Sequence, residues 1–190
     1  MEKTAEMQKA EENAIGVWRF YLPLPVLLAG FLVWKRTSLD VLTLVRYSLL
    51  LGFGYCAAIY DLRKRIVPNL LLLGMLAAWV MWAGAAALTD WDTALLYILR
   101  ALAGGAILGL SALLVYFLSR RGLGGGDVKF LAVSGLYLTV GPGLMAIFLG
   151  TVLSALTALV LMLLRKIGTK DAIPLVPFLY IGILAVSVLA

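Results

Sequence analysis

Histidine is absent from this 190-residue chain, and Cys56 is its only cysteine. The missing histidine excludes Ser-His-Asp triads, Cys-His nucleophiles and HExxH zinc sites. A single cysteine excludes an internal disulfide and a CxxC zinc or redox motif. Haem held by histidine and iron–sulfur clusters held by several cysteines are excluded as well. We therefore expect no metal and no cofactor, and any catalysis has to use other side chains.

Charged residues are also scarce. They make up 14% of the chain, whereas 63% is hydrophobic and the mean hydropathy is +1.03. Soluble domains carry roughly 25% charged residues, and a core of this size cannot bury such an apolar surplus. The composition predicts an integral membrane protein. Its net charge of +6 then indicates basic cytoplasmic loops, with lipid and not nucleic acid as the partner.

Seven apolar stretches follow one another, at about 17–34, 41–60, 70–88, 94–118, 128–140, 143–164 and 173–190. Most reach the roughly 20 residues that span a bilayer as a helix, and backbone in lipid must satisfy its own hydrogen bonds. The predicted fold class is all-α, a polytopic membrane protein with six to seven transmembrane helices. Gly141-Pro142-Gly143 predicts a hairpin between two of them.

Three segments are expected along the chain: a polar cytoplasmic tail at 1–15, an extra membrane segment at 16–40, and one membrane domain at 41–190. Basic residues follow the second, fourth and sixth apolar stretches: Arg63, Lys64, Arg65, Arg120, Arg121, Lys129, Arg165, Lys166 and Lys170. The opposite loops carry Asp90 and Asp92, with Lys35 and Arg36 as the exceptions. The positive-inside rule places the basic loops in the cytoplasm. The five tryptophans mostly fall near expected helix ends, as in interfacial belts.

Asp61 and Asp127 stand out among the ten acidic residues. An even number of membrane crossings separates them, so both should return to the cytoplasmic boundary. Asp61 follows an apolar stretch and precedes Pro68 and Asn69, which would be ordinary first residues of a helix. An acid at a helix carboxyl end opposes the helix dipole unless a basic neighbour pairs with it.

Asp127 closes the run Gly124-Gly125-Gly126. The simplest interpretation is a glycine turn with Asp127 as the N-cap of a helix from Val128. One or two glycines would suffice for a turn, however, whereas three let a foreign backbone approach closely. Lys129 could pair with a carboxylate or mark the membrane interface.

Two carboxyl groups held together share one proton, because both cannot ionise cheaply side by side. One can then act as a base toward water while the other, protonated, polarises a carbonyl and later protonates the leaving amine. This aspartic peptide hydrolysis needs no histidine, cysteine or metal, so the absences described above leave it open.

These residues resemble the GxGD aspartic proteases of membranes, and within them the type IV prepilin peptidases. Residues 61–69 are similar to the D-x-R-x-x-x-I-P-N stretch of that family, and residues 124–129 to its G-x-G-D-x-K motif. Residues 173–178 resemble the late P-x-x-P-F segment that opens its last helix. The presenilin and signal-peptide-peptidase branch shares Tyr-Asp and GxGD, but its late Pro-Ala-Leu motif is absent here.

The resemblance implies a prepilin-peptidase-like membrane protease domain over 41–190, in the cell membrane, that removes a short basic leader from prepilin-like or archaellin-like precursors at the cytoplasmic face. Asp61 and Asp127 would be the catalytic pair. The residues that would shape the loops or bind substrate are Gly124, Gly125, Gly126, Lys129, Pro68, Asn69, Pro174 and Pro177. Many bacterial members carry an insert with paired CxxC motifs and also methylate the new amino terminus. Without it, the chain is similar to the peptidase-only form.

Two other classes of function stay open. A small proton-coupled transporter would use the aspartates as a relay, and it would need them near the middle of the bilayer with access from both sides. A non-catalytic anchor or assembly protein would explain the apolar helices but not the two acids in their motifs. The sequence leaves the oligomeric state undetermined.

Overall fold

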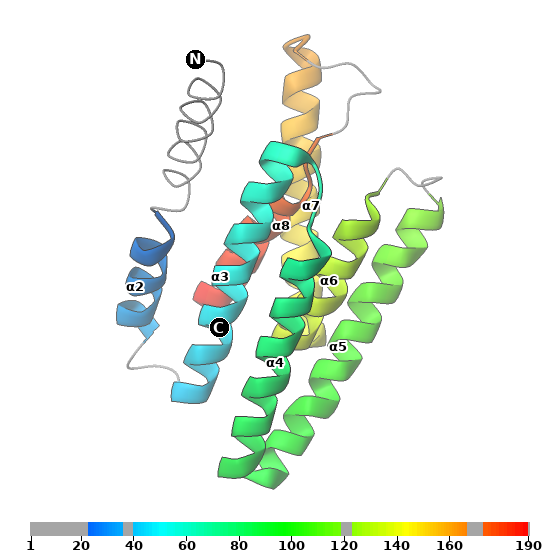
Figure 1. The fold of residues 1–190 in the computed structure, drawn as a ribbon. Coiled ribbons are helices and arrows are strands. Elements are labelled where there is room, and N and C mark those ends of the chain that lie inside the picture. Colours follow the sequence, from blue (N-terminus) through cyan, green and yellow to red (C-terminus); the bar gives the residue numbers. More distant parts are fainter. Residues whose placement is uncertain (1–22, 36–39, 119–122, 167–172, 190) are drawn as a thin grey trace, which may run out of the picture.

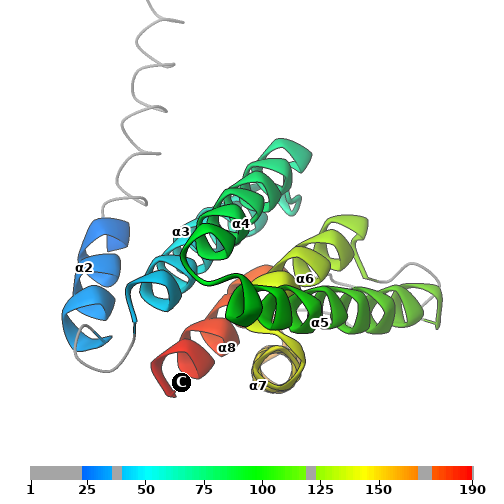
Figure 2. The ribbon, with the colours of Figure 1, turned by 90° about the horizontal axis from the view of Figure 1, so that it is seen from below.

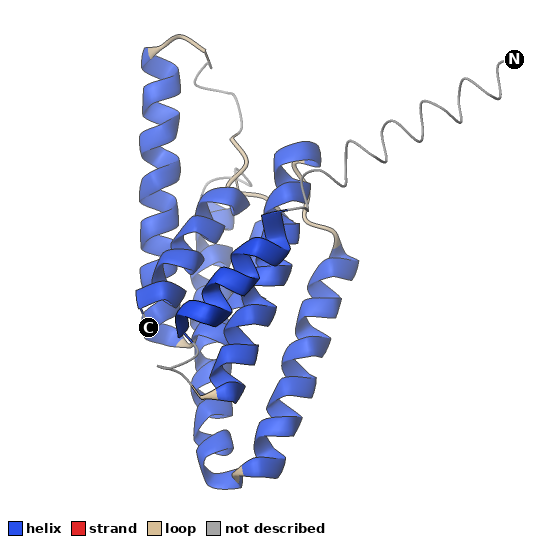
Figure 3. Ribbon diagram, turned by 90° about the vertical axis from the view of Figure 1, so that its left-hand side faces the viewer, coloured by secondary structure: helices blue, strands red, loops and turns tan. Residues whose placement is uncertain are grey.

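The computed structural model describes residues 23–35, 40–118, 123–166 and 173–189. Every regular element in these ranges is a helix (Figures 1 and 3), which confirms the all-α fold class. The helices are α2 (Pro23–Lys35), α3 (Val41–Lys64), α4 (Asn69–Thr89), α5 (Trp91–Leu118), α6 (Gly125–Leu138), α7 (Val140–Leu163) and α8 (Val176–Leu189). The expected tail at 1–15 and the basic residues Arg36, Arg120, Arg121 and Lys170 lie outside the described residues.

Four helices, α3, α4, α5 and α7, are long and apolar enough to cross a membrane, with 21 to 28 residues and mean hydropathies of 1.5 to 2.4. Helices α2 and α8 are apolar but shorter, and α6 has 14 residues. The chain is therefore a polytopic all-α membrane protein, and the expectation of six to seven helices agrees with the seven in its described part.

Successive helices from α3 to α8 run in alternating directions (Figure 1). This alternation brings the end of α3 together with the beginnings of α4, α6 and α8 at one end of the bundle. Seen along the bundle, α5 lies beside α6, and α8 packs against α7 and α3 (Figure 2). The predicted position of Asp61 and Asp127 at the same end of the bundle follows directly from this arrangement.

Close packing against α5 fixes the position of α6. A Cβ atom on Gly104 of α5 would lie 2.5 Å from the carbonyl oxygen of Gly135 of α6, and one on Gly135 would lie 2.6 Å from the Gly104 oxygen. Only residues without a side chain allow the two backbones to approach this closely, as small residues do at helix interfaces in membranes.

Hydrogen bonds from aromatic side chains also hold the far end of α6. Trp79 Nε1 of α4 donates to the Leu136 carbonyl at 3.0 Å, and the Tyr137 hydroxyl donates back to the Met75 carbonyl of α4 at 2.6 Å. Trp79 and Trp82 are buried inside the bundle, so their side chains do not face lipid as those of an interfacial belt would. Their N–H groups find carbonyl partners inside the bundle, whereas Trp34 and Trp91 are exposed.

The turn between α6 and α7 lies at Thr139, two residues before the expected Gly141. Thr139 alone separates the two helices, with a φ of 65° that is rare for a residue with a side chain. Gly141, Pro142 and Gly143 instead lie in the first turn of α7. Proline is accepted there because its missing N–H would have no partner within the helix.

Candidate active site

Asp61 lies in the last turn of α3, not in a loop after it, and is only 5% exposed. Arg65 ends the helix in a left-handed conformation, with φ 53° and ψ 34°, and its N–H donates to the Asp61 carbonyl at 2.8 Å. The chain then passes through buried Val67 to Pro68, which precedes α4. The prediction that Pro68 and Asn69 begin a helix is confirmed, with α4 starting at Asn69.

The Asp61 side chain points to the first residue of α8. The backbone N–H of Val176 donates to Asp61 Oδ2 at 3.0 Å, in a buried hydrogen bond across 115 residues of sequence. No sequence pattern indicates this donor. Pro174 and Pro177 indicate where a helix begins, but they carry no information about which side chain its first N–H faces.

Asp127 is the third residue of α6, whose N-cap is Gly124. The N-cap assignment made for Asp127 is therefore wrong by three positions, because the helix already begins at Gly125 and includes two of the three glycines. The Asp127 carboxylate caps the helix from inside, since the Gly124 N–H donates to its Oδ2 at 3.2 Å.

The electrostatic environment of Asp127 connects the two acids. Burial and then the charge of Asp61 raise the pKa of Asp127 to about 6, against the opposing hydrogen bond from the Gly124 N–H. An effect of this kind requires the carboxyl groups to be near each other. The two residues selected by motif and parity thus share one site.

Gly126 gives α6 its close contact with the segment after α3. A Cβ atom at this position would lie 3.2 Å from Val67 Cβ and 3.4 Å from the Val67 backbone nitrogen. A Cβ atom on Gly125 would meet nothing within 4 Å. No described glycine has a positive φ, so Gly126 is needed for space and not for an unusual backbone conformation.

Lys129 provides a second connection between the motifs. Its Nζ donates to Asn69 Oδ1 at 3.0 Å, which joins α6 to the first residue of α4. A carboxylate partner is one of the two alternatives for Lys129, and in the structure an amide oxygen accepts from its Nζ instead. The three motif segments therefore meet through Asp61 with Val176, Gly126 with Val67, and Lys129 with Asn69.

Basic side chains surround this end of the bundle. Arg63, Lys64 and Arg65 are exposed on the last turn of α3 and just after it, and the Lys64 Nζ lies 5.7 Å from the centre of the Tyr60 ring. Among the described residues, no group of three or more acidic or cysteine side chains is placed to hold a metal ion.

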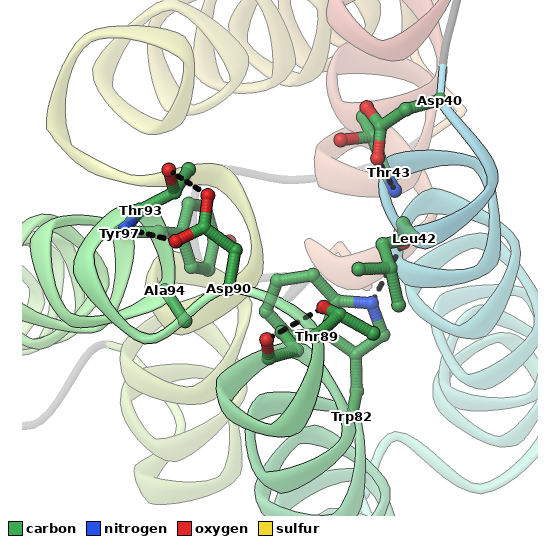
Figure 4. Close-up of a pocket in the computed structure, with 10 residues that line it drawn as sticks. Asp40, Leu42, Thr43, Trp82, Thr89, Asp90, Thr93, Ala94 and Tyr97 are labelled. Carbon is green, nitrogen blue, oxygen red and sulfur yellow. Dashed lines mark hydrogen bonds between the residues drawn. The ribbon is translucent and has the colours of Figure 1, made fainter.

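A different pocket, of about 210 Å³, lies at the opposite end, where α3 begins and α4 meets α5 (Figure 4). Asp40 and Asp90 line it and serve as helix caps, accepting from the backbone N–H groups of Thr43 and Thr93 at 3.0 and 3.3 Å. The 21 residues between Asp40 and Asp61 correspond to roughly 30 Å of helix. This pocket is therefore separate from the motif residues.

Comparison with known families agrees with the motifs. The model of the type IV leader peptidase family matches residues 48–159, which include Asp61, Asn69, Gly124–Asp127 and Lys129. The late segment at 173–178 lies beyond the match. Neither the curated proteins nor the solved structures contain a match to the sequence.

Proposed function

Because the chain belongs to the type IV leader peptidase family, we propose that it is an aspartic endopeptidase that removes short basic leaders from prepilin-like or archaellin-like precursors. The observation that carries this proposal is the close packing of Gly126 against Val67, which brings the first turn of α6 with Asp127 to the end of α3 with Asp61. There the charge of Asp61 contributes to the raised pKa of Asp127. Such an arrangement supports one shared proton, which aspartic hydrolysis requires.

The proposed chemistry uses only these two carboxyl groups and water. The ionised carboxylate takes a proton from water as the water oxygen attacks the scissile carbonyl carbon. The protonated carboxyl donates a hydrogen bond to the carbonyl oxygen, then transfers its proton to the amide nitrogen as the C–N bond breaks. The oxyanion collapses to the new carboxyl group, and the pair resets when the first proton passes from one aspartate to the other.

The glycine run provides the approach for a substrate strand. The open space around Gly125 would admit an extended peptide beside Asp127, while Gly126 keeps the site closed against Val67. Lys129, Asn69, Pro68, Pro174 and Pro177 would shape the loops around it. The protease domain would span 41–190, with 16–40 as an addition to it.

The exposed basic residues support a cytoplasmic position of the site in the cell membrane, since basic loops stay inside. Their charge would repel a basic leader, so we assign them to orientation and to anionic lipid. The transporter alternative is not favoured: Asp61 lies in the last turn of its helix and not near the middle.

Co-expression with a prepilin-like and an archaellin-like precursor tests the proposal. Asp61→Asn and Asp127→Asn should each abolish the size shift of the precursor, because either change removes the shared proton or its acceptor. Asp92→Asn, an exposed acid at the opposite end of the bundle, is the matched control and should cleave normally. Full cleavage by either catalytic variant would refute an aspartic mechanism.

A further inference from the structure

The two aspartates have different surroundings. Asp61 receives the first N–H of α8, while the donor to Asp127 among the described residues is the N–H of Gly124, in its own helix turn. A pair of acids in unequal environments divides into one that stays ionised and one that keeps the proton. Which residue takes which role is not decided by the motifs, because both are aspartates.

The contact with α8 selects the ionised form of Asp61. A backbone N–H can only donate, so Asp61 Oδ2 must accept. Val176 is also the first residue of its helix, where unpaired N–H groups and the helix dipole favour a negative charge. The hydrogen bond is buried, and a charge-assisted bond shielded from water is stronger than an exposed one.

Burial of Asp61 opposes this preference, because it disfavours a charge. The Val176 N–H and then the positive charge of Arg65, just after the end of α3, counter it, and Asp127 of α6 is the competing acid. Helix α4 carries no titratable side chain. In α8 the only such group is Tyr180, whose ring lies against Tyr55 of α3.

We infer that the N-terminus of α8 divides the roles in the pair: the Val176 N–H is a positioning donor that holds Asp61 as the carboxylate that activates water, and Asp127 carries the proton to the substrate. This inference rests on the proposed function. Under this inference, the role of the segment at 173–178 is to present a backbone N–H donor to Asp61, which lies 115 residues earlier in the chain than Val176.

Replacing Val176 by proline isolates that donor. Proline fits the first position of a helix, and the preceding Leu175 already acts as the N-cap, with its carbonyl accepting from Phe178 and Leu179. An N-cap conformation is compatible with a following proline. Val176→Ala is the matched control, because it trims the side chain but retains the N–H.

We expect Val176→Pro to move the acidic limb of the pH–rate profile to higher pH by about one unit, with Val176→Ala leaving the limb in place. A shift in both variants, or in neither, would overturn the assignment. Thermal unfolding of each variant reports whether the bundle is intact.

Infrared difference spectra provide a second reading that does not depend on activity or on the proline variant. In a pH titration followed by the band of the protonated carboxyl, Asp127 in the Asp61→Asn variant should lose its proton at a higher pH than Asp61 in the Asp127→Asn variant. The opposite pattern would overturn the division of roles even if both variants are inactive. Cleavage by either variant would instead refute the proposed function itself.

Discussion

At the scale of single residues, identical side chains acquire different chemistry from their positions. Asp61 lies in the last turn of a long apolar helix and accepts a hydrogen bond from the backbone N–H of Val176 in α8. Asp127 lies in the first turn of α6, partly buried and near the negative charge of Asp61. Asp40 and Asp90 cap helices at the other end of the bundle, where hydrogen bonds from Thr43 and Thr93 keep them as ordinary carboxylates. Only the first two carry unusual surroundings.

The raised pKa of Asp127 predicts a pH dependence. Its proton is present below about pH 6 and is lost above it, and the proposed mechanism needs that proton for the carbonyl and the leaving amine. The cleavage rate should therefore fall above pH 6, approaching tenfold per pH unit. A rate profile on a purified precursor measures this, and a rate that stays flat from about pH 6 to 8 would contradict it.

At the scale of elements, the position of α6 determines where Asp127 lies relative to Asp61. Gly104 and Gly135 set its distance from α5, and the side chains of Trp79 and Tyr137 fix its far end to α4. At its beginning, Gly126 rests on Val67 and Lys129 bonds Asn69. Because both ends are held, a small change at the glycine run should displace the carboxyl group.

Gly125 and Gly126 form a matched pair for testing this. Alanine at Gly126 would press on the backbone of Val67, move Asp127 and lower kcat by on the order of tenfold. Alanine at Gly125 meets nothing within 4 Å, so it should retain kcat and raise KM if the substrate strand crosses there. Steady-state kinetics separates the two effects, and equal effects of both variants would contradict the geometry.

At the scale of the whole molecule, the bundle has two chemically different ends. Arg63, Lys64 and Arg65 surround the aspartates at one end, while Asp40, Asp90 and Asp92 lie at the other. Arg46 is buried near the acidic end, with its guanidinium 4.4 Å from the centre of the Tyr97 ring and 4.8 Å from that of Tyr47. The exposed charges therefore support the proposed orientation, in which the acids of the site face the cytoplasm.

The single cysteine makes this orientation measurable. In a Cys56→Ser background, Ile66→Cys lies at the end with the aspartates and Asp92→Cys at the opposite end, and both positions are exposed. A membrane-impermeant thiol reagent applied to intact cells should label Asp92→Cys alone, and both after permeabilisation. Labelling of Ile66→Cys alone in intact cells would reverse the proposed orientation.

The sequence by itself determined the membrane class, the helices from α3 to α8 to within a few residues, and the return of Asp61 and Asp127 to one end of the bundle. These follow from the length of apolar runs and from parity, which depend on neighbours in the chain and on lipid as the solvent. The helix starts at Gly125 and Val140 were displaced from expectation, because glycines and a proline that favour turns are also accepted in a first helical turn.

Only the tertiary structure decided how the motifs meet. The contacts of Val176 with Asp61, Gly126 with Val67 and Lys129 with Asn69 join segments far apart in the chain, and no local pattern encodes which pairs come together. The same holds for the pKa of Asp127, which depends on burial and on a charge from another helix. The absence of histidine and the scarcity of cysteine leave hydrolysis by carboxyl groups open. The packing of α3, α6 and α8 gives two of these groups their unequal surroundings.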